Sequence, residues 1–61
     1  MVRAKDGTII TQAGKTISCS DGSRYFLSGK VLSGPHGTVS RNVGSPQEAL
    51  AIVIGLHGGQ R

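Results

Sequence analysis

Few side chains in this 61-residue chain are able to carry out acid–base, nucleophilic or metal-binding chemistry. They are Cys19, His36, His57, Asp6, Asp21 and Glu48. Nucleophilic catalysis needs a nucleophile, a base and an orienting group close together. We expect Cys19 in the core, where a thiol is inert, and we expect the histidines and acids at turns and helix ends. The spacing of the cysteine and the two histidines fits no zinc site. The sequence therefore predicts no catalytic residues, no cofactor, no metal site and no enzyme.

Three tripeptides that end in glycine divide the middle of the chain into runs rich in β-branched and aromatic residues. They are Gln12-Ala13-Gly14, Ser20-Asp21-Gly22 and Pro35-His36-Gly37. Glycine closes a three-residue hairpin loop without steric penalty, so we expect hairpins at all three places. The predicted strands then span 8–11, 15–19, 23–33 and 38–43. A two-residue Asp21-Gly22 turn is the competing interpretation, and a bulge near Gly29 would also change the pattern.

These loops set the strand register and therefore the two faces of the sheet. Ile9 is expected opposite Ile17, Ile17 opposite Tyr25, and Val31 opposite Arg41. The predicted core face carries Ile9, Ile17, Cys19, Tyr25, Leu27, Val31, Val39 and Val43. The predicted open face carries Thr8, Ile10, Thr16, Ser18, Arg24, Phe26, Ser28, Lys30, Leu32, Ser40 and Asn42.

The clearest single element is a C-terminal helix within 45–58. Ser45 is a typical N-cap, Pro46 suits the first helical position, and Glu48 completes a capping box. Gly58-Gly59 ends the helix. The predicted fold is a single α+β domain over 1–61, a four-stranded antiparallel meander (β-β-β-β-α) with the helix on one face. Residues 1–7 are either an edge strand or disordered.

The last third of the chain, from Ser45-Pro46-Gln47-Glu48-Ala49-Leu50 through Gly58-Gly59, resembles short conserved-hypothetical proteins of bacteria. That resemblance implies no particular activity, cofactor or partner.

Two apolar surfaces predict a small non-enzymatic protein-interaction module, with self-association as one form of it. The apolar arc of the helix covers roughly 200°, wider than one sheet contact needs. Leu50 and Ile54 are therefore expected to meet another molecule, unless loops or the N-terminal segment cover them. On the open face, Ile10, Phe26 and Leu32 are expected to form the centre of a homodimer contact. The alternative is an ordinary outer face with a few exposed hydrophobic side chains.

The charge of the chain favours a second function, a basic nucleic-acid-binding module. Seven Lys and Arg residues against three acids give a net charge of +4. On the open face an aromatic side chain lies among cations, the minimal form of a stacking platform for single strands. The residues for this function are Arg24, Phe26, Lys30 and Arg41. An ordinary solvated surface explains the same charge without a partner.

No segment of the sequence is expected to enter a membrane. The first ten residues lack the pattern of a signal peptide. The longest apolar run, 49–54, is far shorter than the roughly 20 residues that span a bilayer. With one unpaired cysteine, we expect a cytoplasmic protein.

Overall fold

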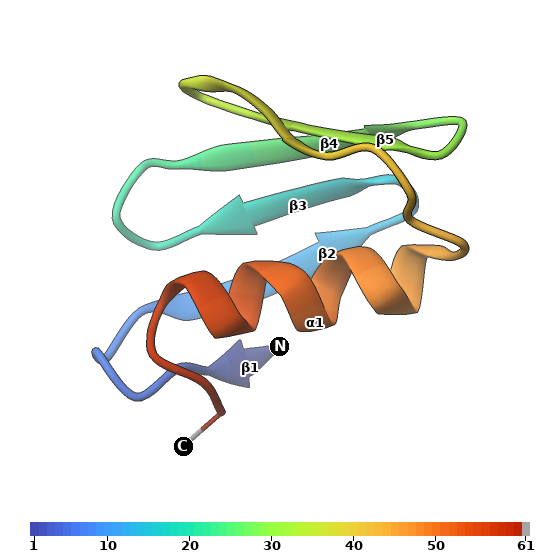
Figure 1. Cartoon of the computed structure of the whole chain (residues 1–61). Helices are drawn as coiled ribbons and strands as arrows, with labels where there is room; N and C mark the ends of the chain where they lie inside the picture. Colours follow the sequence, from blue (N-terminus) through green and yellow to red (C-terminus); the bar gives the residue numbers. More distant parts are fainter. Residues whose placement is uncertain (61) are drawn as a thin grey trace.

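The computed structural model describes residues 1–60, which form one antiparallel sheet and one helix lying across a face of that sheet (Figure 1). The elements are β1 (Val2–Arg3), β2 (Ile9–Ala13), β3 (Thr16–Cys19), β4 (Arg24–Ser28), β5 (Val31–Gly34), β6 (Gly37–Ser40) and α1 (Pro46–Leu56). Neighbouring strands in the sheet follow the order of the chain from β1 to β6. The α+β class, the antiparallel meander and the C-terminal helix are as predicted. The predicted number of strands is wrong, because the sheet has six strands and not four.

Both additional strands come from segments that the glycine tripeptides do not mark. Residues 1–7 supply the edge strand β1, in which Val2 faces Ile10. The predicted long strand 23–33 is instead a hairpin, with Gly29 and Lys30 between β4 and β5. Gly29 has φ +61°, which suits the first central position of a two-residue II′ turn. The irregularity considered near Gly29 is therefore a complete reversal of the chain.

The register of the first hairpin differs from the prediction, and this difference exchanges the faces on which Ile9 and Ile10 lie. Ala13 faces Thr16, so the loop is the dipeptide Gly14-Lys15 and not Gln12-Ala13-Gly14. Ile10 then faces Cys19, and the predicted Ile9–Ile17 pair is wrong. Because the register is shifted by an odd number of residues, Ile10 turns to the core and Ile9 to the open face.

The second predicted hairpin is confirmed. Ile17 faces Tyr25, and the Cys19 N–H donates to the Ser23 carbonyl at 2.9 Å, which leaves Ser20-Asp21-Gly22 as the loop.

The last hairpin is one residue tighter than predicted. Gly34 faces Gly37 across Pro35 and His36, and the register then shifts between Leu32 and Ser33. Leu32 faces Ser40, where β6 ends, so the predicted Val31–Arg41 pair lies beyond the ladder.

The helix begins and ends at the predicted signals. Ser45 Oγ accepts from the Glu48 N–H at 3.2 Å, and Glu48 Oε2 accepts from the Gly44 N–H at 2.8 Å. These two bonds satisfy amides at the helix start that would otherwise have no partner. At the other end, Gly58 and Gly59 have positive φ, and the Gly59 N–H donates to the Ile54 carbonyl at 2.9 Å.

The core lies between α1 and the sheet. Its buried hydrophobic residues are Ala4, Ile10, Ile17, Cys19, Tyr25, Leu27, Leu32, Val43, Ala49 and Val53. Val39, Leu50, Ile52 and Ile54 are half-buried and pack against this cluster. Within residues 1–60 there is no helix with the length and apolar character that crossing a bilayer requires.

Candidate functional site

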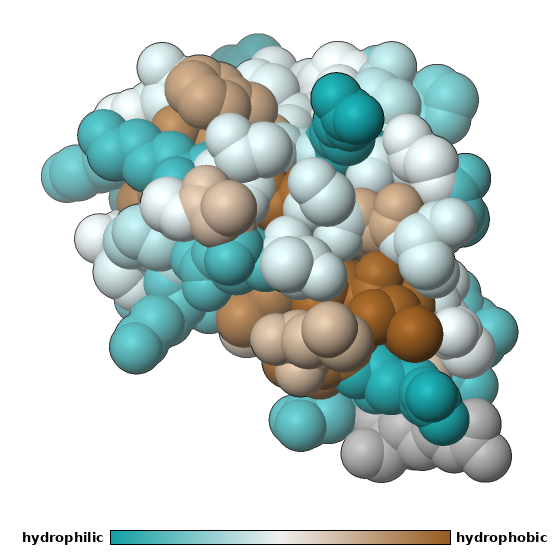
Figure 2. All heavy atoms as spheres, turned by 180° about the vertical axis from the view of Figure 1, so that it is seen from behind, coloured by the Kyte–Doolittle hydropathy of each residue, from teal (hydrophilic) through white to brown (hydrophobic). Residues whose placement is uncertain are grey.

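The face of the sheet away from α1 is the first candidate surface, because no helix or strand formed by residues 1–60 packs on it (Figures 1 and 2). The register places on it Arg3, Ile9, Thr11, Ala13, Thr16, Ser18, Arg24, Phe26, Ser28, Val31, Ser33 and Thr38. Half of these residues carry a hydroxyl group. Figure 2, which views the molecule from behind Figure 1, shows a surface of mostly pale and teal residues, with a larger brown patch in the lower half and smaller ones above it. We call this surface the open face.

Phe26 lies near the middle of the open face. It faces Thr16 on β3 and Ser33 on β5, and its side chain is 52% exposed. Arg24 and Ser28, the nearest β4 residues on the same face, are also exposed. The predicted exposure of Phe26 is confirmed.

The predicted placement of Ile10 and Leu32 beside Phe26 is wrong. Both are fully buried, at 0% exposure. Ile10 faces Cys19 because of the Gly14-Lys15 turn, and Leu32 faces Leu27 because of the turn after β4. The open face therefore lacks two of the three hydrophobic residues expected on it, and carries the half-buried Ile9 and Val31 instead.

The predicted cations are divided between the open face and one end of the sheet. Arg24 is on the open face, two residues from Phe26. The β2–β3 turn, the β4–β5 turn and the end of β6 lie at the same end of an antiparallel meander. These turns lie on the right in Figure 1. Lys15 and Lys30 belong to the two turns and Arg41 directly follows β6, so the three cations are gathered at this end of the sheet. Lys15 is not among the predicted site residues, because the predicted loops place it in a strand and not in a turn.

The three acids of the chain are already engaged by main-chain amides. Asp6 Oδ1 accepts from the Thr8 N–H at 2.8 Å, and Asp21 Oδ1 accepts from the Ser23 N–H at 2.9 Å. Glu48 is bonded to Gly44 as described above. In the part of the chain that the structure describes, no Lys or Arg lies within 4.0 Å of a carboxylate, and the sole ion pair joins His57 to Asp6.

Hydrogen bonds keep two of these carboxylates ionised. Bonds from the Thr8 side chain and amide, with a smaller contribution from His57, lower the pKa of Asp6 from 3.8 to about 2. Bonds from Ser23 lower the pKa of Asp21 in the same way.

A second cluster joins the two ends of the chain and was not predicted. Asp6 Oδ2 lies 2.8 Å from His57 Nδ1, and Thr8 Oγ1 lies 3.4 Å from the same nitrogen. The Lys5 N–H donates to the Gly59 carbonyl at 2.8 Å, and Ala4 and Gln60 form an antiparallel bridge. The cluster therefore holds the C-terminal segment against the extension of β1.

The Asp6–His57 pair is arranged like the acid and the base of a catalytic triad, but no nucleophile among residues 1–60 completes it. Within residues 1–60, His57 Nε2 is buried and has no hydrogen-bond partner, so it meets no nucleophile. Burial also raises the pKa of the Cys19 thiol, which makes it a weak nucleophile. Across residues 1–60, no three His, Cys, Asp or Glu side chains are arranged to hold a metal ion.

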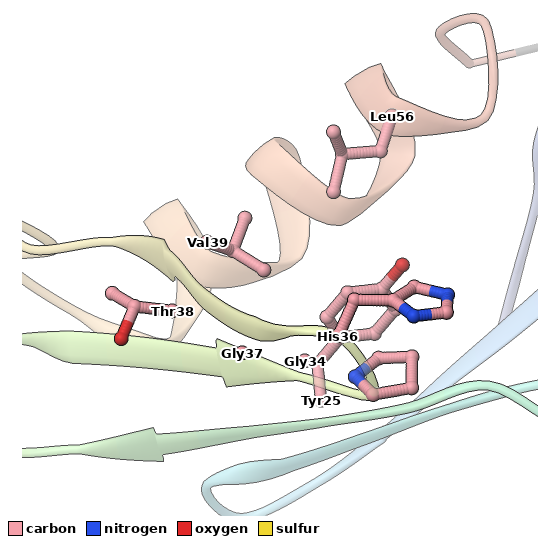
Figure 3. Close-up of a pocket in the computed structure, with 8 residues that line it drawn as sticks. Tyr25, Gly34, His36, Gly37, Thr38, Val39 and Leu56 are labelled. Carbon is pink, nitrogen blue, oxygen red and sulfur yellow. The ribbon is translucent and has the colours of Figure 1, made fainter.

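An open pocket of about 370 Å³ lies on the helix side of the sheet, at the β5–β6 hairpin (Figure 3). It is lined by Tyr25, Gly34, Pro35, His36, Gly37, Thr38, Val39 and Leu56. Figure 3 shows Leu56 reaching from α1 toward the sheet, with Tyr25 and His36 on the facing side. Leu56 is 56% exposed, whereas the predicted contact residues Leu50 and Ile54 are half-buried against the core.

No protein-family model matches the chain, and no curated protein or solved structure is similar enough to it to indicate a family or a fold relative.

Proposed function

We propose that the chain is a small non-enzymatic binding module whose open face binds an acidic macromolecule. One observation carries the proposal: across residues 1–60 every acid is bonded to a main-chain amide, while no Lys or Arg is paired with an acid. The positive charges are therefore left for an external partner. A net charge of +4 on so small a chain attracts anions over about 8 Å at physiological salt.

The position of the cations supports the open face as the binding surface. Arg24 lies on the open face beside Phe26, and Lys15, Lys30 and Arg41 border one end of the sheet. An extended acidic polymer laid across the open face meets both groups.

Self-association through the open face is the weaker alternative. Ile10 and Leu32 would have been the apolar centre of such a contact, and both are buried. The hydrophobic residues that the register places there instead, Ile9 and Val31, are half-buried and offer less exposed apolar area than a dimer contact needs.

A second candidate function, self-association through the end of α1, is favoured by Leu56. This side chain is 56% exposed at the mouth of the pocket, and Leu50 and Ile54 extend the apolar surface along the helix. Sedimentation equilibrium over a concentration series tests it. Dimers that Leu56→Ser abolishes would support this function, and a monomer at every concentration would exclude it.

The test of the primary proposal is the binding of fluorescent polyanions at two salt concentrations. Polyglutamate, heparin and oligonucleotides are the probes, because they share negative charge and little else. We expect binding that weakens as salt rises, and a larger loss for Arg24→Gln than for Lys5→Gln, a matched change in the loop after β1. Absence of binding to every probe at low salt, or equal losses for the two variants, would refute the proposal.

A further inference from the structure

We infer that the acidic partner is single-stranded nucleic acid, with one base stacked on Phe26; this rests on the function proposed above. The surroundings of Phe26 are the first support. Its direct neighbours across the sheet are Thr16 and Ser33, and both are much shorter than a phenyl ring. With 52% of Phe26 exposed, a flat ligand has access to the ring.

The composition of the open face favours a nucleobase over an acidic protein. Protein interfaces depend on several clustered apolar anchors. Among residues 1–60 the large hydrophobic side chains that are mostly exposed are Met1, Phe26 and Leu56, and Leu56 is at the pocket on the helix side. A base needs only one aromatic ring, because every base has a π-face to stack. The hydroxyl groups around Phe26 both donate and accept hydrogen bonds, so they can pair with the donors and acceptors along the edge of any base.

The shape of the molecule favours a single strand over a duplex. Reading a major groove needs a protruding helix or two-stranded ribbon. Here α1 packs Ala49 and Val53 into the core on the opposite side, and the open face is a continuous sheet. Bases within a duplex are already stacked on each other and do not present a face to Phe26.

The cations lie close enough to Phe26 for a short single strand of nucleic acid to contact them while one base stacks on the ring. Arg24 is two residues away on the same face, about 7 Å along the extended strand. In the other direction Lys30 lies in the turn that follows β4, two residues beyond Ser28. A strand of a few nucleotides with a base on Phe26 therefore reaches positive charge on both sides.

The test compares three variants of Phe26 by fluorescence anisotropy with four probes. The variants are Phe26→Ala, Phe26→Leu, which keeps apolar volume without a ring, and Phe26→Tyr, which keeps the ring. The probes are a single-stranded oligonucleotide of about ten nucleotides, an abasic strand of equal length, a duplex and polyglutamate. Gln47→Ala, an exposed position in the first turn of α1, is the control for truncating a side chain outside the open face. Circular dichroism verifies that each variant is folded.

We expect Phe26→Ala and Phe26→Leu to weaken oligonucleotide binding about 5- to 150-fold. Phe26→Tyr and Gln47→Ala are expected to bind the oligonucleotide as the unchanged chain does. Binding of the abasic strand and of polyglutamate is expected to be the same for every Phe26 variant. Equal binding of the oligonucleotide and the abasic strand, or no loss of oligonucleotide affinity in Phe26→Leu, would overturn the inference. Neither result would contradict the proposed binding of an acidic partner. Tightest binding to polyglutamate would instead identify an acidic protein, and binding to none of the probes would refute the proposed function itself.

Discussion

Gly34→Ala is expected to destabilise the fold, because β5 passes close to Tyr25 at this residue. A Cβ atom at Gly34 would lie 2.8 Å from Tyr25 Cε2, 2.9 Å from Tyr25 Cδ2 and 2.9 Å from Val39 Cγ2. Ordinary contacts of a Cβ atom are at 3.4–4 Å. The Tyr25 ring belongs to the buried core, so β5 and the ring must move apart by about half an ångström.

The cost follows from the effects of overpacking. Inserting a methyl group into a packed core costs about 1–3 kcal/mol. A chain of this length has a total unfolding free energy of roughly 3–9 kcal/mol. Because 1 kcal/mol corresponds to about 4–8 °C in a domain of this size, the melting temperature is expected to fall by roughly 5–20 °C.

The assay is thermal unfolding followed by circular dichroism, with Gly55→Ala as the matched control. A Cβ atom at Gly55 meets no heavy atom within 4 Å, and alanine favours a helix over glycine by about 0.5–1 kcal/mol. The control is therefore expected to melt higher than the unchanged chain. A Gly34→Ala variant that melts at or above the unchanged chain would refute the packing of β5 on Tyr25.

Three further predictions concern the register, the terminal cluster and the thiol. Leu32→Ala should lower the unfolding free energy by about 2–5 kcal/mol and Phe26→Ala by less than about 1 kcal/mol in urea titrations, and equal losses would contradict the assigned faces. The pKa of Asp6 in the folded state, about 2, lies below the ordinary 3.8, so its contribution to stability is complete above about pH 4 and lost as the pH falls toward 2. Asp6→Asn should flatten the loss of urea stability in that range, and an unchanged slope would exclude the contribution. Cys19 should react slowly with an aromatic disulfide reagent in the folded protein and quickly in urea, because burial shields the thiol and raises its pKa; rapid labelling of the folded protein would place the thiol outside the core.

The elements whose ends are marked by residues with a strong preference for one position could be predicted from the sequence. Ser45, Pro46 and Glu48 each favour one position at a helix start, and the helix begins there. The Ile17–Tyr25 pair is also confirmed. The three-residue loop Ser20-Asp21-Gly22 puts the apolar side chains of both strands on one face, and this favours it over the two-residue Asp21-Gly22 turn.

The hairpins that turn at Gly14-Lys15 and Gly29-Lys30 could not be predicted in the same way, because several turn types fit the same residues. Gly14-Lys15 and Gly29-Lys30 are both two-residue loops with glycine first, yet each lies within a longer run that also fits a strand or a three-residue loop. The choice between the possible turns at Gly14 depends on whether Ile10 is buried. Its burial is decided by contacts with Cys19 in the next strand and with the helix, which are distant in the sequence.

The Asp6–His57 contact lay beyond sequence reasoning for a different reason. The two residues are 51 positions apart and belong to no motif. They meet because β1 pairs with β2 while α1 returns across the sheet and ends beside the loop after β1.

The most direct test of the central claim is a two-dimensional NMR titration of the isotope-labelled chain with a single-stranded oligonucleotide at low salt. We predict that the amide resonances that move belong to the open face around Phe26, with Thr16 and Ser33 among them, and that Ala51 on the exposed side of α1 stays in place. Movements confined to α1 and the pocket, or no movement at any ratio, would contradict binding through the open face.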